Sequence, residues 1–258
     1  MLSGCKSSDQ PTESVVVQFN VYGLEVTQSG IGPNLAPMDE PKAPNHLTIF
    51  EGTSEKPLYI GTSFTPEVKL IRGQHTLTFI ATYQDHPTYT NGVWTADKQE
   101  NTFGAVLPIN TETIASEVDV ELTRANYAIC WNPTNTVNED GLTATIIVEP
   151  FRSTLTAGLI GGTTYTKTFE NIALKKGNIS LTLNGYCGQF GVEEAVTTTL
   201  TIYQGKTQLA SATIDAPVLS NRKTTITGNI LNSTKTNKVS INYEWLQEKT
   251  VTLPTAED

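Results

Sequence analysis

The sequence predicts an all-β fold made of two antiparallel β-sandwich domains in tandem. Apolar residues recur at every second position in most periodic segments, which is the spacing of a strand with one buried and one solvent-facing side. Threonine is abundant, and its β-branch suits a pleated surface while its hydroxyl tolerates water. No segment carries an apolar stripe at helical spacing over three turns, so we expect a sandwich-like, antiparallel arrangement.

Four segments show the alternation clearly, and the last of them is a candidate terminal strand that either closes its own domain or is lent to a neighbour. Their apolar positions, in chain order, are Val15, Val17, Phe19 and Val21; His75, Leu77, Phe79, Ala81 and Tyr83; Ile179, Leu181 and Leu183; and Val239, Ile241, Tyr243 and Trp245. Since successive strand side chains point to opposite faces, each set predicts the buried face of one strand.

One segment, EVDVELTRANYAICW, changes phase. Its apolar residues occupy even positions up to Leu122 and odd positions from Ala125 onward. A slip of one residue indicates a β-bulge or a strand that passes from one sheet to another. We therefore expect a bulge or bend at residues 123–125.

The domain boundary is predicted by NPTNTVNEDG, residues 132–141, a dense run of turn and loop formers. It separates an N-terminal domain of residues 14–132 from a C-terminal domain of residues 141–258, with a linker at 133–140. An earlier segment, residues 29–45, holds four prolines and two glycines and is predicted to be a long surface loop.

The composition excludes several partners. The 258 residues carry a net charge of −9, which argues against nucleic acid and against electrostatic docking on anionic lipid. No stretch approaches the roughly 18 consecutive apolar residues of a membrane helix.

The first residues follow the pattern of a bacterial lipobox. Leu2, Ser3 and Gly4 are one apolar and two small residues, and they precede Cys5, the candidate lipid anchor. The polar segment that follows predicts a flexible tether, so residues 1–13 form lipobox and tether. A natural gene product of this kind would carry a signal peptide upstream. The competing interpretation is an ordinary cytosolic N-terminus.

The two remaining cysteines, Cys130 and Cys187, form no CxxC pair, so a zinc site is not indicated. They could form one disulfide in an extracytoplasmic protein, or each could be a small buried hydrophobe. We favour free thiols.

Motifs for catalysis or metal binding are missing. The histidines His46, His75 and His86 show neither HxH nor HExxH spacing, and His75 sits on the apolar face of its strand as a satisfied core or edge residue. No GxSxG motif is present. Residues 158–162 are glycine-rich but lack a following helix, which predicts a flexible loop between strands. Glu193 and Glu194 are adjacent and should face opposite ways. We expect no enzyme, no metal and no cofactor.

The tryptophans could offer a stacking surface for sugars. Trp94 follows a turn and is the best candidate for an exposed aromatic residue. Trp131 and Trp245 lie in phase with buried faces and are better explained as core residues.

The chain resembles the fimbrillin superfamily of Bacteroidetes lipoproteins, the subunits and anchors of protease-assembled pili. Three features carry the resemblance: the lipobox, the segment EVDVELTRANYAICW with its Leu-x-Arg at Leu122 and Arg124, and NRKTTITGNIL at residues 221–231. The resemblance implies two sandwiches of Greek-key, transthyretin-like type. In this family the segment EVDVELTRANYAICW corresponds to the last strand of the N-terminal domain, and NRKTTITGNIL corresponds to a late strand of the C-terminal domain. The resemblance also implies a lipid-anchored protein at the outer membrane, on the cell surface.

The family further implies assembly by strand addition, after an arginine-specific protease removes the lipid and first strand of a stalk subunit. This chain departs from that pattern, because no arginine lies between Cys5 and Arg72. We therefore expect a non-catalytic pilus anchor or accessory subunit in adhesion, held to the membrane through Cys5 and contacting other pilus subunits. The alternative is a glycan-binding surface lipoprotein built from β-sandwich modules.

Overall fold

The computed structural model describes residues 13–23, 44–82, 88–95, 102–230 and 247–252, and every regular element in these ranges is a strand. In chain order the strands are β1 (Ser14–Tyr22), β2 (His46–Glu51), β3 (Pro57–Gly61), β4 (Glu67–Ile71), β5 (Gln74–Thr82), β6 (Thr88–Thr90), β7 (Val93–Thr95), β8 (Phe103–Asn110), β9 (Glu117–Glu121), β10 (Thr123–Arg124), β11 (Asn126–Trp131), β12 (Thr136–Val137), β13 (Leu142–Phe151), β14 (Thr154–Thr156), β15 (Tyr165–Ala173), β16 (Gly177–Asn178), β17 (Leu181–Tyr186), β18 (Glu194–Gln204), β19 (Thr207–Val218), β20 (Arg222–Thr227) and β21 (Gln247–Thr252).

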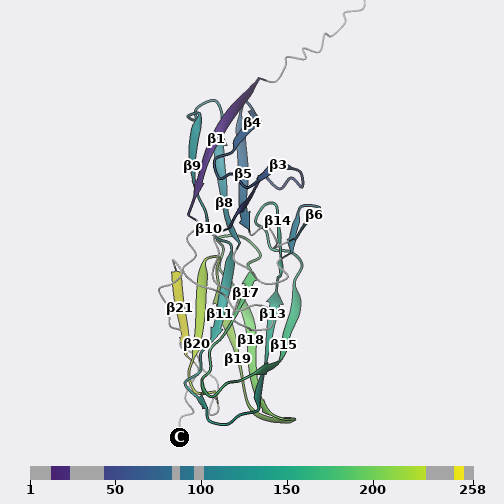
Figure 1. Cartoon of the computed structure of the whole chain (residues 1–258), viewed down its shortest axis with the longest axis vertical. Helices are drawn as coiled ribbons and strands as arrows, with labels where there is room; N and C mark the ends of the chain where they lie inside the picture. Colours follow the sequence, from purple (N-terminus) through teal and green to yellow (C-terminus); the bar gives the residue numbers. More distant parts are fainter. Residues whose placement is uncertain (1–12, 24–43, 83–87, 96–101, 231–246, 253–258) are drawn as a thin grey trace, which may run out of the picture.

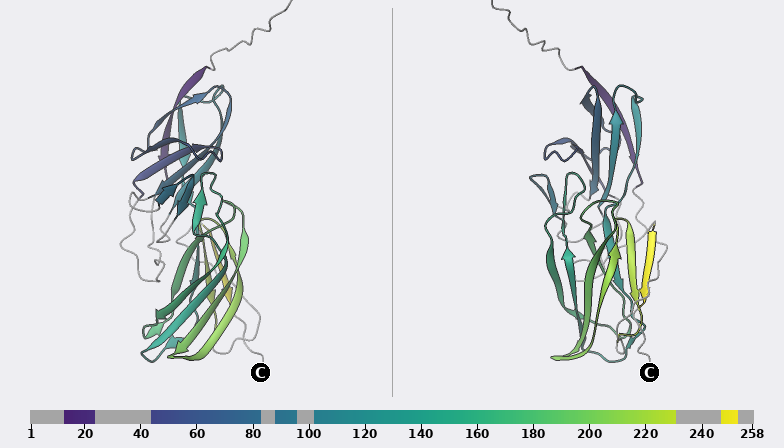
Figure 2. Two further views of the ribbon diagram at one scale, coloured as in Figure 1. Left: turned by 90° about the vertical axis from the view of Figure 1, so that its right-hand side faces the viewer. Right: turned by 180° about the vertical axis from the view of Figure 1, so that it is seen from behind.

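The strands form two lobes that lie end to end along the long axis (Figures 1 and 2). The first lobe packs the sheet β4-β1-β9 against the sheet β10-β8-β5-β2-β3. The second lobe packs β17-β11-β20-β21 against β15-β13-β18-β19. The prediction of two β-sandwich units is confirmed.

Not every pairing is antiparallel. β1 pairs with β9 in parallel, and so do β11 with β20 and β20 with β21. A parallel neighbour needs a long connection, and β9 follows β1 only after most of the first lobe has been traversed. Alternation within a strand shows which side is buried but carries no information on the direction of its neighbour.

The first lobe has its core between its two sheets. Val17 and Phe19 of β1 are fully buried, as the alternation predicts, and they face Leu47 and Phe79 of the opposite sheet. The rings of Phe19 and Phe79 meet edge to face with centroids 5.2 Å apart. Burying each such aromatic side chain contributes about 1.5–3 kcal/mol.

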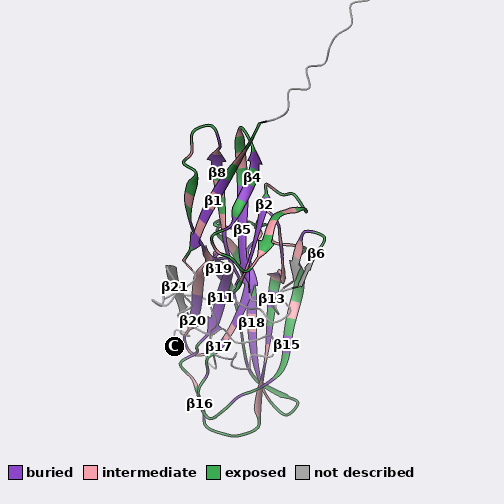
Figure 3. Ribbon diagram, turned by 45° about the horizontal axis from the view of Figure 1, so that its top comes forward, coloured by how far each residue is buried: buried purple, intermediate pink, exposed green. Residues whose placement is uncertain are grey.

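The second lobe has a separate and larger core. Tyr127, Ile129 and Trp131 of β11 are fully buried in it, so the core assignment of Trp131 is confirmed. The indole Nε1–H of Trp131 donates to Thr198 Oγ1 over 3.1 Å. Figure 3 shows buried residues running along the strands of both lobes.

The phase slip at residues 123–125 marks the passage of the chain from one lobe to the other. β10 pairs with β8 in the first lobe, whereas β11 pairs with β17 and β20 in the second. Between them the amide of Ala125 donates to the carbonyl of Thr102 over 2.7 Å. Reading this whole segment as one strand of the first domain was wrong for residues 126–131, because their side chains belong to the second core.

The linker predicted at residues 133–140 stays a prediction as a domain limit. It contains the short strand β12, which pairs with β16, and β11 ahead of it lies on the second lobe's side of the crossing. The long loop predicted at residues 29–45 lies almost entirely outside the described residues.

The bond between Trp131 and Thr198 is open to a direct test. Replacing Thr198 by valine keeps the side-chain shape but leaves the buried indole N–H without its acceptor, so the free energy of unfolding should fall by about 1–3 kcal/mol. Urea denaturation measures this loss. The control Thr213→Val changes an exposed position of β19 and should stay within about 0.5 kcal/mol of the parent. Equal losses in the two variants would contradict the assigned role.

Candidate functional site

The first strand is an integral part of the first lobe. β1 lies in the middle of its sheet, with β4 on one side and β9 on the other. It contributes the fully buried residues Val17 and Phe19 to the core. Removal of this strand would uncover both neighbours and open a groove along the lobe, which is the geometry that strand addition requires.

The arginines decide whether a protease can perform that removal. The chain has four: Arg72, Arg124, Arg152 and Arg222. Arg124 is only 3% exposed, and the side chains of Arg152 and Arg222 are 14% and 11% exposed. Arg72 is the accessible one, with a side chain that is 47% exposed and Nε 2.9 Å from Glu13 Oε2.

Arg72 lies in the turn between β4 and β5, not between β1 and β2. A cut there would separate all of β1–β4 from the rest of the chain, including Leu47 and Ile49 of β2, an inner strand of its sheet. Because half of the first core would leave with that fragment, cleavage at Arg72 cannot open a groove of one strand's width.

The last described strand pairs within the second lobe. β21 runs parallel to β20, with Thr224 opposite Lys249 and Ile226 opposite Val251. Its backbone therefore extends the sheet that contains β11 and β17. The candidate terminal residues Val239, Ile241, Tyr243 and Trp245 lie outside the described residues, so their burial stays a prediction.

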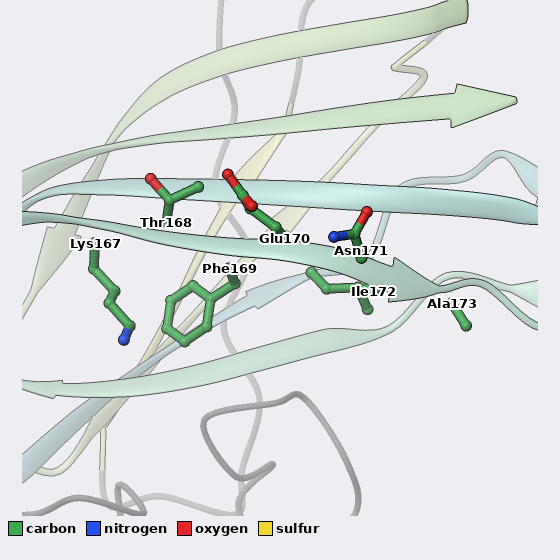
Figure 4. A pocket seen from close by; sticks show the side chains of 7 residues that line it. All are labelled: Lys167, Thr168, Phe169, Glu170, Asn171, Ile172 and Ala173. Atoms are coloured by element: carbon green, nitrogen blue, oxygen red, sulfur yellow. The ribbon is translucent and has the colours of Figure 1, made fainter. Parts of the chain in front are cut away.

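A shallow groove follows β15, the edge strand of the other sheet, and is lined by residues 167–173 (Figure 4). Phe169 and Lys167 point to one side of the strand and Thr168 and Glu170 to the other. The ammonium of Lys167 lies 5.4 Å from the centre of the Phe169 ring, within cation–π distance.

β15 is interrupted by a β-bulge. Ala144 pairs with Ile172 but Ile146 pairs with Phe169, so Glu170 and Asn171 together oppose one residue of β13. Asn171 has a φ of 55°, in the left-handed region. Bulges and charges on an edge strand hinder the addition of a further strand, which makes this edge a poor acceptor.

Glu193 and Glu194 do not converge, as predicted. Glu194 Oε1 lies 2.7 Å from Arg152 Nη1 and also accepts the amide of Gly188 over 3.1 Å, whereas Glu193 pairs with Arg222. Each carboxylate is thus neutralised by its own arginine. No local sequence pattern indicates these pairs, because each arginine is distant in sequence from its glutamate.

Cys130 and Cys187 are free and buried, as favoured from the sequence. Burial, and then the nearby Glu194 carboxylate, raise the pKa of the Cys187 thiol to about 12. Since the thiolate is the nucleophilic form, a thiol that stays protonated at neutral pH is unsuited to covalent catalysis.

His75 is satisfied on both ring nitrogens, as predicted. Nδ1 lies 2.7 Å from Glu51 Oε1, and Nε2 lies 2.7 Å from the carbonyl oxygen of Ile71. His86 lies outside the described residues. Within the described ranges no three His, Cys, Asp or Glu side chains gather closely enough to hold a metal ion.

The remaining predicted site residues fall outside the description. Cys5 and the lipobox residues Leu2, Ser3 and Gly4 precede the first described residue. Trp94 is placed as part of β7, but its side chain is not among those described. No helix in the described part of the chain is long and apolar enough to cross a membrane.

The prediction of a flexible loop at residues 158–162 was wrong. Leu159 is fully buried, and the amide of Gly161 donates to the carbonyl of Gly188 over 3.1 Å. The sequence held a signal for this packing, since Leu155, Ala157 and Leu159 alternate like the buried face of a strand. The glycines next to these residues made the alternating pattern look like a loop.

One family model matches part of the chain. Residues 153–255, less than half of the chain, match a family model described as "Family of unknown function (DUF6562)". No curated protein matches the chain.

Three solved structures are similar to the chain. A candidate adhesin from Bacteroides ovatus has 10% sequence identity and a TM-score of 0.49, over 83% of this chain and 88% of that one. A fimbrial assembly protein from Parabacteroides distasonis has 11% identity and a TM-score of 0.47, over 93% and 99%. A candidate polysaccharide-binding protein from Bacteroides thetaiotaomicron has 12% identity and a TM-score of 0.46, over 77% and 79%.

The names of these proteins agree with the family resemblance noted in the sequence. At this level of similarity they add no argument about what the chain does.

The raised pKa of Cys187 predicts how the thiols respond to reagents and to pH. Neither Cys130 nor Cys187 should be alkylated by a maleimide at pH 8 in the folded protein, and both should be labelled in urea, as located by mass spectrometry of peptides. Rapid labelling of Cys187 without urea would contradict its burial.

The raised pKa of Cys187 also predicts how the free energy of unfolding changes with pH. Because the fold favours the protonated thiol, its contribution is complete below the unfolded pKa and is lost as the pH rises toward about 12. Unfolding free energies measured between pH 8 and 11 should therefore fall, and fall less steeply in Cys187→Ala.

Proposed function

We propose that this chain is a non-catalytic cell-surface lipoprotein of the fimbrillin type, anchored in the outer membrane through Cys5, that acts as a pilus anchor or accessory subunit in adhesion. The observation that carries the proposal is the position of the accessible arginine. Arg72 follows β4, so an arginine-specific protease finds no accessible site from which to remove β1 alone.

The position of β1 in the middle of its sheet supports the proposal that the first strand is retained. A subunit that keeps β1 has no open groove in its first lobe, so it cannot accept a strand there from a neighbour. It also keeps whatever precedes β1 in the chain, including the tether and Cys5. A lipid on that cysteine would then remain attached to the folded protein.

The pairing of β21 with β20 supports the same role. A strand that pairs within its own sheet is not free to serve as a donor while it does so. Both routes by which a stalk subunit polymerises are therefore closed in this form of the chain. Such a protein can end a fibre or hold it to the membrane, but it cannot extend it.

The alternative, a glycan-binding lipoprotein, finds no specific support among the described side chains. The exposed aromatic residues there are Tyr22 on the first lobe and Tyr165 on the second. The hydroxyl of Tyr165 donates to Ser153 Oγ over 3.0 Å, and among the side chains that the structure describes no second exposed ring accompanies either tyrosine. A sugar platform needs aromatic faces in a group.

Lipidation can be tested in a bacterial host that produces the protein behind a signal peptide. The parent should incorporate labelled palmitate and partition with membranes, and Cys5→Ala should do neither. The control Cys130→Ala removes a buried thiol and should stay labelled. Membrane partition that survives Cys5→Ala would sink the anchoring proposal.

Retention of β1 can be tested with an arginine-specific protease. The parent should stay monomeric after treatment and show no SDS-resistant ladder. The matched variant Lys42→Arg places an arginine between β1 and β2, so a cut there would release β1 alone. Treatment of that variant should remove the first strand and yield unfolded or oligomeric product. A ladder from the treated parent would identify a polymerising stalk subunit instead.

A further inference from the structure

The second lobe reaches into the first through one short segment. This segment, called the latch here, comprises residues 154–161 between β13 and β15 and begins with β14. β14 pairs antiparallel with β7 of the first lobe, with Thr156 opposite Val93. The amide of Ala157 then donates to the carbonyl of Gly92 over 3.0 Å. β14 and β6 lie at the level where the lobes meet (Figure 1).

The tip of the latch is buried in the first lobe. Leu159 is 0% exposed and belongs to a third apolar cluster, distinct from the two lobe cores. Phe50 and Ile80, both fully buried, contribute to this cluster from the outer face of a first-lobe sheet. Tyr186 contributes from the second lobe. The cluster is therefore assembled from both lobes and exists only while they are docked.

Gly104 makes room for the tip. A Cβ atom at this position of β8 would lie 2.8 Å from both Cδ atoms of Leu159 and 3.1 Å from the carbonyl oxygen of Phe79. Real Cβ atoms essentially never lie 2.8 Å from another heavy atom, so a larger residue at 104 requires the Leu159 side chain to shift. The large side chain of Leu159 in the latch and the absent side chain of Gly104 in β8 are thus complementary in shape.

The latch is fastened to its own lobe as well. The amide of Phe190 donates to the carbonyl of Leu159 over 3.2 Å, and Ile160 forms a bridge with Gln189. At its base, Arg152 forms its ion pair with Glu194 at 2.7 Å, while the carbonyl of Arg152 accepts the amide of Tyr186 over 3.1 Å. A movement of the latch would have to break these contacts or carry the second lobe with it.

The backbone at the tip is held in a conformation that leucine disfavours. Leu159 has a φ of 55°, in the left-handed region, where a Cβ atom crowds the following carbonyl. Such a conformation persists where the surroundings determine it, and here the buried side chain and the hydrogen bond from Leu159 N to Thr156 O do so.

A second set of contacts ties the lobes at the chain crossing. The amide of Thr102, ahead of β8, donates to Asn126 Oδ1 of β11 over 2.8 Å. The hydroxyl of Thr102 is 2.8 Å from the hydroxyl of Tyr186, also in the second lobe. These bonds are buried, so breaking them without water would leave polar groups unpaired.

We propose that the latch couples the two lobes into one rigid body that unfolds as a single unit, with Leu159 as the plug and Gly104 as its socket. Lobes joined by a small polar contact move relative to one another by default, and a buried apolar plug removes that freedom. β1 begins at the outer end of the first lobe, so a pull between it and the second lobe crosses this junction (Figure 1). The inference does not depend on lipidation or on a pilus.

Differential scanning calorimetry of the full chain tests the coupling. The parent should show one transition with equal calorimetric and van't Hoff enthalpies. Leu159→Ala removes the second-lobe side chain that occupies the space beside Gly104. Gly104→Val fills the same space from the first lobe. Each variant should split the trace into two transitions, one for each lobe.

Two leucines serve as controls. Leu200→Ala creates a cavity in the second core away from the latch and should lower the single transition without splitting it. Leu209→Ala removes a side chain that is 44% exposed and should change nothing. Two transitions in the parent, or one transition in both latch variants, would overturn the proposal.

Hydrogen exchange provides a readout that does not require the latch variants to fold. If the lobes are coupled, Leu200→Ala in the second lobe should speed exchange of the slowest amides of β1 and β5 in the first by the same factor as those of β18. Unchanged exchange in the first lobe would show that the lobes open independently and would refute the coupling.

Discussion

The passage of the chain between the lobes at Ala125 is the constraint on which the rest of the structure depends. Residues on either side of it belong to different cores, and the amide of Ala125 is held by the carbonyl of Thr102. Since Thr102 also binds Asn126 and Tyr186, the end of one lobe and the start of the other share a buried polar network. The latch adds to this junction, because Leu159 packs in the same apolar cluster as Ala125 and Tyr186.

The same junction explains why the outer face of a first-lobe sheet is apolar. Phe50 and Ile80 point away from the first core, where a solvent-facing strand would carry polar residues. They are buried because the latch covers them, and Gly104, opposite Ile80 on the neighbouring strand β8, leaves space for Leu159. Strands β2 and β5 therefore depart from strict alternation because both of their faces are buried where the lobes dock.

The location of the arginines links the fold to the proposed role. Three are buried or nearly so, two of them in ion pairs that secure the ends of β18 and β20, and the accessible one follows four strands. The burial of Arg152 and Arg222, whose side chains are 14% and 11% exposed, keeps them from the reach of a protease. Two strands of the second lobe are likewise poor acceptors of a further strand, because β15 is bulged and β20 already pairs with β21.

The sequence by itself determined the strands, their buried faces and the place where the chain changes sheets. Alternation at Val17 and Phe19 and the slip before Ala125 are local properties, and the physics of the pleat converts them directly into sidedness. It also predicted free thiols at Cys130 and Cys187 and carboxylates at Glu193 and Glu194 that do not meet.

Tertiary structure alone decided which strands became neighbours, in which direction they ran, and what covered their outer faces. The parallel pairing of β1 with β9 joins segments almost a hundred residues apart, and no local period encodes it. The sequence did not indicate the latch for the same reason. The glycines around Leu159 are typical of a loop, and the space that Gly104 leaves for Leu159 is visible only in the folded structure. Side-chain period is set by neighbours in sequence, whereas docking depends on the complementary shapes of residues that are far apart in the chain.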